Sequence, residues 1–365
     1  MPCLSRLCLI LLLTAFSRAA AQEASWEPQR TWVFAVGALK FDRKTTFSFP
    51  NKDRADVKLL DVWKKRGVPE SQIVFIKNEE ATKAGIEARL TPFAQQPKAA
   101  DTLIFYYTGH GGRDMNSPTR AVSFSTYDTR STWTVNSIVE TIERHFRGKQ
   151  VLYFADCCHS GALADRISRG RQRAAALCSA HVTSTSTGNW TFTETLVRVF
   201  GGDGISDADR NGSITFTEGS AFVCREMVAF EDQLTARGLA GGFPAGFQLS
   251  PATTIPPAGA RVGQVVEVKT QNKWWTARII AEEGERVKVT YPGWGEDWDE
   301  WAAPNRVRPV QKEAIAKGTR VRVEWNGQWF DARIVEVVDG IHRVHYEGYP
   351  DSDDEFVSRG RIQTR

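Results

Sequence analysis

A chain of 365 residues is long enough for two or three domains, and its 41% hydrophobic and 25% charged residues exclude a disordered protein. The formal net charge of +4 is a mild surplus spread along the chain, so we expect neither a nucleic-acid partner nor binding to a membrane surface.

The chain begins with the three parts of a secretory signal peptide, over residues 1–21. MPCLSRLC carries Arg6, LILLLTAF is a short apolar run, and three alanines precede Gln22 at a typical cleavage point. The apolar run is too short to span a bilayer as a mature helix, and its lack of an amphipathic pattern disfavours a buried N-terminal helix. We therefore expect a secreted or periplasmic protein without stable membrane insertion.

Four cysteines remain when such a leader is removed, namely Cys157, Cys158, Cys178 and Cys224. Four are too few for a disulfide scaffold in a chain of this length. The sequence leaves open whether Cys178 and Cys224 form a disulfide.

Short apolar strands alternate with helices between residues 31 and 233. The predicted strands are 31–39, 72–77, 102–109, 150–157 and 175–182, and the predicted helices are 55–67, 81–93, 134–146 and 192–200. This alternation predicts an α/β domain, residues 22–241, in which helices cover both faces of a mostly parallel sheet. Reactive groups in such sheets gather beyond the carboxyl ends of the strands.

Two of the buried strands end in turns with chemically reactive side chains. LIFYYTGHGG places His110 just past one strand, and VLYFADCCHSG places Cys158 at the end of the other. If the two strands are neighbours, the imidazole can activate the thiol as a nucleophile. The glycines after His110 leave a backbone N–H accessible to an oxyanion on a substrate carbonyl.

The turns YTGHGG and DCCHSG resemble the two signature turns of caspase-like cysteine peptidases, and most closely those of the metacaspase branch. The likeness extends from about residue 31 to residue 233. It implies that His110 is the catalytic histidine, that Cys158 is the nucleophile, and that the backbone N–H groups of Gly111 and Cys158 form the oxyanion hole. No cofactor is required for this chemistry.

Two acidic residues bear on specificity. Asp156 lies two residues before Cys158, and the resemblance pairs it with an acid on the first helix, which corresponds to Asp56. Two carboxylates bind a guanidinium group well, so we expect a peptide or protein substrate that is cleaved after Arg or Lys. The alternative for Asp56 is an ordinary acid in the first turn of a helix.

An arginine-rich segment, residues 164–174, follows the nucleophile in the region where caspase-like chains are often cut. A flexible basic loop suits an enzyme that cleaves after Arg, so self-processing is one expectation. A solvated basic loop without such a role is the alternative.

Two other classes of protein compete with the peptidase. Cys157, Cys158 and His159 are all potential metal ligands, but adjacent positions point in divergent directions and no second ligand cluster has zinc-site spacing. The other rival is a catalytically silent caspase-like scaffold that acts as an extracellular binding or adaptor protein through its C-terminal modules.

Residues 207–218 fit the pattern of an EF-hand calcium loop. Its oxygen ligands would be Asp207, Asp209, Asn211, Ser213 and Glu218, with glycine at the sixth position. Calcium is therefore a possible cofactor, and an Asx-rich turn that caps the next helix is the alternative.

The composition changes after residue 241. Residues 242–260 are rich in proline and glycine and predict a linker. An internal repeat with a constant offset of 55 residues follows, in units 261–310 and 316–365. Each unit consists of short alternating strands and predicts a small, strongly bent β-barrel.

The ends of both units, YPGWGEDWDEW and YEGYPDSDDEF, resemble those of Tudor, agenet and chromo-type barrels, whose aromatic cages hold cationic side chains. The resemblance implies a cage in the first unit, formed by Tyr291, Trp294, Trp298 and Trp301. The second unit has Asp353 in place of Trp298, so we expect no complete cage there. The alternative is that these aromatics form barrel core, and the protein partner of the barrels stays unknown.

Overall fold

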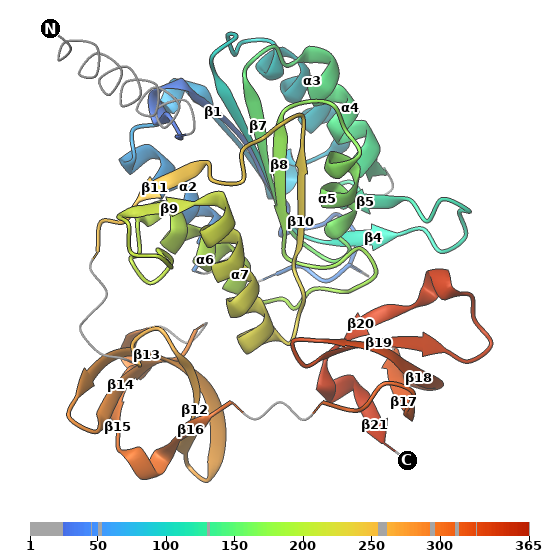
Figure 1. Ribbon diagram of the computed structural model, residues 1–365. Helices are drawn as coiled ribbons and strands as arrows, with labels where there is room; N and C mark the ends of the chain where they lie inside the picture. Colours follow the sequence, from blue (N-terminus) through green and yellow to red (C-terminus); the bar gives the residue numbers. More distant parts are fainter. Residues whose placement is uncertain are drawn as a thin grey trace, which may run out of the picture.

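The computed structural model shows one α/β domain followed by two small β domains (Figure 1). The described residues are 25–44, 46–49, 53–129, 132–254, 261–292, 296–310, 314–325 and 327–364. The predicted signal peptide, residues 1–21, lies outside them. Within these ranges, no helix combines the length and the apolar character needed to cross a membrane.

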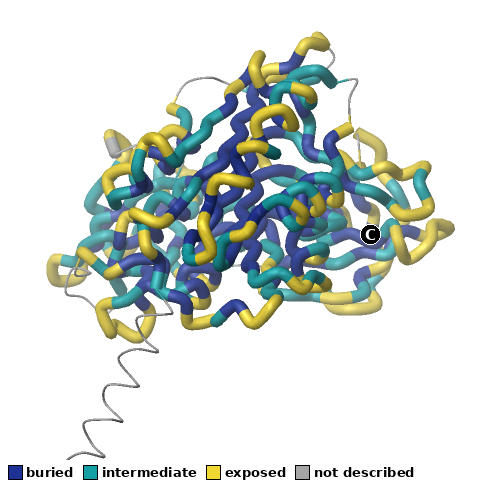
Figure 2. The backbone as a smooth tube through the Cα atoms, turned by 90° about the horizontal axis from the view of Figure 1, so that it is seen from above, coloured by how far each residue is buried: buried dark blue, intermediate teal, exposed yellow. Residues whose placement is uncertain are grey.

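The α/β domain is built on a six-stranded sheet with the order β10-β8-β7-β3-β1-β2. Its strands are β1 (Thr31–Gly37), β2 (Ile73–Lys77), β3 (Thr102–Thr108), β7 (Gln150–Asp156), β8 (Ala174–Cys178) and β10 (Ala236–Ala240). Neighbouring strands are parallel except at the edge, where β10 is antiparallel to β8. The predicted mostly parallel sheet is confirmed, and it forms the buried centre of the molecule (Figure 2).

Helices cover both faces of this sheet. They are α2 (Ala55–Lys65), α3 (Lys83–Ala94), α4 (Val135–His145), α5 (Gly161–Ser168), α6 (Thr191–Gly201) and α7 (Phe216–Glu231). The apolar residues of α3, α4 and α5 form one core cluster with one face of the sheet, and those of α2, α6 and α7 form a second cluster with the other face. Alternate residues of each strand enter opposite clusters, as the pleat of a strand requires.

A small antiparallel sheet extends from the carboxyl end of β3. It consists of β4 (Gly111–Arg113), β5 (Val122–Phe124) and β6 (Trp133–Thr134). The hairpin between β4 and β5 projects toward the last β domain (Figure 1). The residues that follow His110 therefore lead directly to the boundary between domains.

The linker predicted for residues 242–260 begins too early. Strand β11 (Gln248–Pro251) pairs antiparallel with β9 (Ser213–Thr215), and Phe243 and Phe247 are buried in the core. The α/β domain thus continues through β11. The proline and glycine content of this segment predicts a linker. Its apolar residues have no helical spacing, so the sequence did not reveal that they belong to the core.

The two C-terminal units have the same five-stranded topology. Barrel 1 contains β12 (Val265–Thr270), β13 (Lys273–Glu283), β14 (Arg286–Thr290), β15 (Glu300–Ala302) and β16 (Val307–Pro309). Barrel 2 contains β17 (Arg320–Trp325), β18 (Gln328–Val338), β19 (Ile341–Tyr346), β20 (Glu355–Val357) and β21 (Ile362–Thr364). The longest strand of each unit has a register shift at equivalent positions, which bends the sheet.

Short 3-10 helices connect many of these elements. They are η1 (Pro28–Arg30), η2 (Glu70–Gln72), η3 (Asn78–Glu80), η4 (Glu296–Trp298), η5 (Pro304–Arg306), η6 (Asp351–Asp353) and η7 (Arg359–Arg361).

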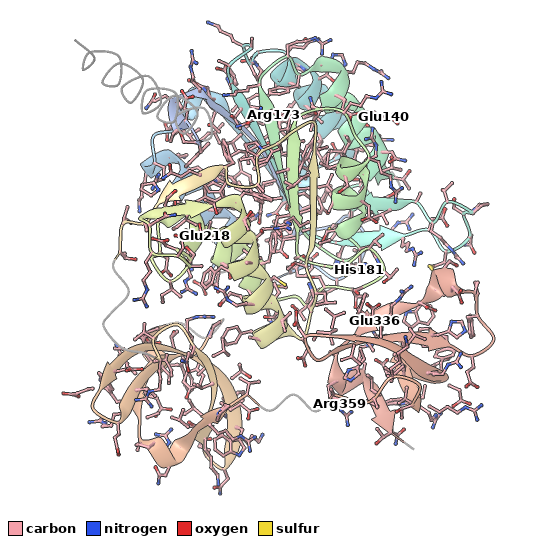
Figure 3. The ribbon with its side chains drawn as sticks, viewed as in Figure 1. Glu140, Arg173, His181, Glu218, Glu336 and Arg359 are labelled. Carbon is pink, nitrogen blue, oxygen red and sulfur yellow. The ribbon has the colours of Figure 1, made fainter. Side chains whose placement is uncertain are left out.

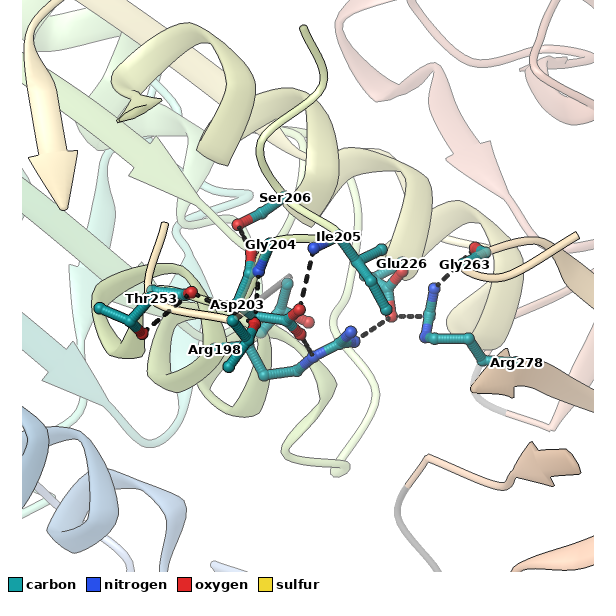
Figure 4. Close-up of polar contacts among 12 residues, drawn as sticks. Arg198, Asp203, Gly204, Ile205, Ser206, Glu226, Thr253, Gly263 and Arg278 are labelled. Carbon is teal, nitrogen blue, oxygen red and sulfur yellow. Dashed lines mark hydrogen bonds and ion pairs between the residues drawn. The ribbon is translucent and has the colours of Figure 1, made fainter. Parts of the chain in front are cut away.

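Barrel 1 contacts the α/β domain through a buried ion pair. Arg278 on β13 is 1% exposed, and its guanidinium group pairs with the carboxylate of Glu226 on α7 (Figure 4). Arg198 on α6 also contacts Glu226, at 3.5 Å, and pairs with Asp203 at 2.7 Å. The ring of Phe222 lies 5.6 Å from the guanidinium carbon of Arg278 and adds a cation–π contact.

Barrel 2 contacts the α/β domain at the end of the sheet that carries His110 and Cys158. Asp353 forms an ion pair with Arg120 at 2.9 Å, and the carbonyl of Phe356 accepts a hydrogen bond from the Ser184 hydroxyl at 3.0 Å. The Phe356 ring also meets the ring of His181 edge-on, with centroids 5.1 Å apart. The two barrels therefore dock on different parts of the α/β domain.

Candidate active site

His110 and Cys158 lie in one cleft, as predicted from the two strand ends. Strands β3 and β7 are parallel neighbours, and Thr108 is paired with Asp156 at their carboxyl ends. Each strand is followed within two residues by a member of the pair. Both residues line a cavity of about 480 Å³.

The ring of His110 is held in one tautomer. Its Nε2 lies 2.7 Å from the backbone carbonyl of Phe47, and a carbonyl can only accept a hydrogen bond. Nε2 therefore carries the proton, and Nδ1 of the neutral ring is left as the basic nitrogen. The rings of Phe41 and Phe49 pack on the imidazole at centroid distances of 5.0 and 4.5 Å and fix its plane.

The Cys158 thiol is partly buried beside backbone amides. The N–H of Ser186 donates to its sulfur at 3.2 Å. Burial raises the pKa of the Cys158 thiol, while hydrogen bonds from the backbone N–H groups of Ser186, Cys158 and Gly111 lower it. Because burial is the larger effect, the group is a thiol at neutral pH, and its proton must be removed before it can attack.

Gly111 is fixed sterically in this arrangement. A Cβ atom at this position would lie 1.9 Å from the carbonyl oxygen of Cys158, so only glycine allows the two turns to approach. The close approach brings the Gly111 and Cys158 amides to the same sulfur. Two N–H donors beside a nucleophile can stabilise a tetrahedral oxyanion.

The same cavity has an acidic end. Asp156 lines it and is 7% exposed, and the hydroxyl of Thr193 donates to its carboxylate at 2.7 Å. Burial raises the pKa of Asp156 to about 6. Asp53 and Glu194 also line the cavity, and burial raises the pKa of Glu194 as well.

Asp56 does not line this cavity in the structure. Its side chain is fully buried outside the cavity lining, and Arg54 donates from Nε to its carboxylate at 3.0 Å. Asp53 and Glu194 were missed by the sequence analysis. Asp53 lies just before the predicted helix, and Glu194 joins the site only because α6 packs beside the end of β7.

The neighbours of Cys158 do not form a metal site. The sulfur of Cys157 belongs to the core cluster, and Nδ1 of His159 lies 3.0 Å from the Val182 carbonyl. In the described parts of the chain, neither residue belongs to a group of three ligands close enough to share an ion. Cys178 and Cys224 are both free thiols, so they do not pair.

The arginine-rich segment 164–174 is not the flexible loop that the sequence suggested. Its first half belongs to α5, and Arg166 pairs with Glu143 at 2.7 Å. The segment then enters β8, where Ala174 pairs with Val151 near the amino end of β7. Arg173 therefore lies at the opposite end of the sheet from the turns that carry His110 and Cys158 (Figure 3).

The predicted calcium loop lies between α6 and α7. Carboxylate oxygens of Asp207, Asp209 and Glu218 lie within 4.8 Å of one another. Glu218 also caps α7, because its carboxylate accepts from the Thr215 N–H at 2.9 Å. The Asn211 N–H donates to the carboxylates of Asp207 and Asp209, so the turn is ordered by its own hydrogen bonds, and Ser213 begins β9.

The cage predicted for barrel 1 is not assembled among its described residues. The Tyr291 hydroxyl donates to Glu300, and Trp301 follows Glu300 on the same strand, so it points to the opposite face. The guanidinium of Arg286 covers the Trp301 ring, and Trp298 is exposed. Trp294 lies outside the described residues.

The aromatic cavity occurs in barrel 2, where the sequence predicted no complete cage. Trp325, Phe330, Tyr346 and Tyr349 line it. The end-of-unit motif contributes only the two tyrosines, and the other two rings come from strands β17 and β18. An aromatic residue at equivalent positions of both repeats, Trp275 and Phe330, was the signal available in the sequence.

Comparison with known proteins supports the assignment of the first domain. Residues 54–234 match the family described as Caspase domain, a family of cysteine peptidases. No curated protein matches the chain.

The solved structures that match this chain fall into two groups. A protein of Geobacter sulfurreducens matches with 17% identity and a TM-score of 0.48, over 62% of this chain and 99% of its own. Caspase-1 of Spodoptera frugiperda matches with 15% identity and a TM-score of 0.44, over 60% and 90%. The tandem Agenet domain 3-4 of ADCP1 matches with 17% identity and a TM-score of 0.14, over 28% and 79%.

Proposed function

We propose that this protein is a cysteine endopeptidase of the metacaspase type that cleaves after Arg or Lys. The observation that carries the proposal is the shared cleft of Cys158 and His110, in which the Phe47 carbonyl fixes the proton on Nε2 and leaves Nδ1 as the base.

The residues of the cleft support a two-step reaction. His110 Nδ1 takes the thiol proton, and Sγ of Cys158 attacks the scissile carbonyl, whose oxygen accepts from the amides of Gly111 and Cys158. His110 then gives the proton to the departing amine, and a thioester remains. A water molecule, deprotonated by the same nitrogen, attacks the thioester and releases the acid product and the free thiol.

The preference for a basic residue rests on the acidic end of the cavity. Asp53, Asp156 and Glu194 line it. A guanidinium or ammonium group is therefore favoured, and the carboxylate of an Asp side chain is repelled.

Active-site labelling tests this proposal. A peptidyl-arginine acyloxymethyl ketone should label the wild type and leave Cys158→Ala unlabelled. Cys224→Ala is the matched control and should still be labelled, because Cys224 lies on α7 outside the cleft. Labelling only by the aspartate analogue would refute the basic preference, and no labelling at all would favour the silent scaffold.

Calcium binding is a second proposal, favoured by the proximity of the Asp207, Asp209 and Glu218 carboxylates. The ion would also take oxygen atoms of Asn211 and Ser213 if the loop binds as an EF-hand does. Isothermal titration with CaCl2 should show one site that is lost in Asp207→Ala. Unchanged titration in that variant would contradict the proposal.

We expect self-processing after Arg173 to occur between two molecules. Arg173 lies at the end of the sheet opposite the nucleophile, whereas the start of the segment, on α5, lies nearer to it. Processing should therefore slow in proportion to dilution, and wild-type enzyme should cut the Cys158→Ala chain. For location, the pattern of residues 1–21 supports export.

A further inference from the structure

A second cavity lies on the other side of Cys158, between the α/β domain and barrel 2. Its volume is about 430 Å³. One wall is aromatic, with Trp325, Phe330, Tyr346 and Tyr349 from barrel 2. The ring of Phe330 stands edge-on to the other three at 6.1 to 6.2 Å, and Trp325 and Tyr349 are 45% and 48% exposed. Aromatic surface of this kind is available to a ligand.

The opposite wall continues the catalytic turns. His159 follows the nucleophile directly, and Arg113 lies two residues beyond the oxyanion amide of Gly111. Met115 lines the same wall from the β4–β5 hairpin. The sequence neighbour of the nucleophile and a residue close to the oxyanion glycine thus both line this cavity.

The orientation of the bound substrate places the leaving group toward the second cavity. The side chain before the scissile bond is directed to the acidic end of the first cavity, among Asp53, Asp156 and Glu194. His110, which protonates the departing amine, is followed by β4, and β4 leads to Arg113 in the second cavity. The residues after the scissile bond, the primed side, thus pass toward the aromatic wall.

Both carboxylates in the lining of this cavity are paired with arginines. Asp353 pairs with Arg120 at 2.9 Å, and Glu355 accepts from Arg361 at 2.7 Å and from the Tyr346 hydroxyl at 2.6 Å. Arg113 donates from Nη2 to the Ser352 carbonyl at 2.8 Å. No carboxylate in the lining is left uncompensated, so the aromatic wall suits an uncharged side chain better than a cation.

One polar group in the lining is unsatisfied. Nε of Arg113 is buried and has no hydrogen-bond partner in the described part of the chain. A buried N–H without a partner is costly. Because this atom has no accessible surface, the aromatic wall is what the cavity presents to a ligand.

We propose that this cavity is a primed-side subsite, formed jointly by the α/β domain and barrel 2, that accepts a large apolar or aromatic side chain of the substrate. The inference rests on the proposed peptidase function. It gives barrel 2 a direct part in substrate selection.

Two kinds of substrate distinguish the contributions of the two cavities to cleavage. A short substrate has Arg followed directly by a fluorescent leaving group and reaches only the acidic cavity. An internally quenched peptide extends four residues past the same Arg, with Phe, Leu, Ala, Lys, trimethyllysine or Asp scanned at each position. At one of the four scanned positions, Phe or Leu should give a kcat/KM at least about tenfold higher than that of the peptide with Ala there.

The variants Phe330→Leu and Tyr349→Ala should reduce that preference to within about threefold of Ala, and they should leave the short substrate unchanged. Trp329→Ala is the matched control, since Trp329 is exposed on the same strand but faces away from the cavity. Persistence of the preference in both cavity variants would overturn the proposal. A preference for Lys or trimethyllysine would overturn it too, in favour of a cation cage.

A binding measurement distinguishes this proposal from the peptidase function itself. Cys158→Ala is titrated calorimetrically with the four-residue product peptide that carries Phe at the selected position, or with each scanned peptide if the wild type cleaves none. Binding that is lost with Tyr349→Ala and retained with Trp329→Ala supports the subsite even if no cleavage is detected. Absence of binding by every apolar peptide would refute it.

Discussion

The two barrels share a sequence pattern and a strand order, but they present different residues to the α/β domain. Arg278 of barrel 1 is buried against Glu226, whereas Arg333, its equivalent in the repeat, is exposed. Barrel 2 instead contacts the catalytic end of the sheet through Asp353 and Phe356. Asp353 occupies the repeat position of Trp298. The residue at which barrel 2 differs from barrel 1 is therefore the one that contacts the α/β domain.

The two barrels share an internal cluster of hydrogen bonds between a Glu, a Tyr and an Arg. In barrel 1 the carboxylate of Glu300 joins Tyr291 and Arg306, and in barrel 2 Glu355 joins Tyr346 and Arg361 in the same way. The recurring residues thus maintain the fold of each unit. The residues that differ between the units decide where each unit docks, and so what it can contribute to the active site.

The largest difference should be seen when the buried ion pair of barrel 1 is broken. Glu226→Ala leaves Arg278 buried without its counter-charge and should lower the free energy of unfolding by roughly 3–5 kcal/mol. Denaturant unfolding at neutral pH measures this. Arg333→Ala, at the equivalent position of barrel 2, should change it by less than about 0.5 kcal/mol.

Replacing both partners checks the cause. Glu226→Met combined with Arg278→Met should recover most of the loss, because well-packed apolar side chains avoid the desolvation of two charges. Equal destabilisation by Arg333→Ala would show that the barrels do not differ in this respect. No recovery in the double variant would show that the unpaired charge is not the cause of the loss.

The acidic cavity is lined by neither barrel, so its titration should be independent of both. Because burial raises the pKa of Asp156 to about 6, kcat/KM for Arg substrates should fall as the pH drops through 6. Asp156→Asn should remove this pH dependence and lower kcat/KM roughly a hundredfold. A different apparent pKa in Glu226→Ala or Tyr349→Ala would contradict the separation.

The same shift has a consequence for stability. The folded-state pKa of Asp156 lies above the ordinary value of 3.8, so the folded chain binds this proton more tightly than the unfolded chain does. Stability from this group is present below pH 3.8 and is lost as the pH rises through 6. Asp156→Asn should therefore unfold at a higher temperature than the wild type at pH 7.

The smallest effect should come from the Arg120–Asp353 pair that docks barrel 2. Both side chains are partly exposed, at 22% and 16%, so each charge reversal should cost at most about 1 kcal/mol of stability. Arg120→Glu should nevertheless lower turnover of the extended peptides a few-fold, and Asp353→Arg in the same chain should restore it. A parallel loss with the short substrate would show that the pair acts on the catalytic residues instead.

Much of this architecture follows from local sequence patterns. Alternating apolar strands and helices predicted the parallel sheet, and His110 and Cys158 were brought together because parallel neighbours end at the same edge. The repeat offset of 55 residues predicted two equivalent units. These features depend on periodicity and chain order, which a sequence contains directly.

The tertiary structure decided which charges and rings are available. Asp56 is buried and paired with Arg54, and Glu194 lines the cavity because α6 packs beside the end of β7. The aromatic cavity was predicted in barrel 1 but is found in barrel 2, where Phe330 lies beside the end of the sheet that carries His110 and Cys158. Burial and pairing arise from contacts between residues far apart in the chain, and no local pattern encodes them.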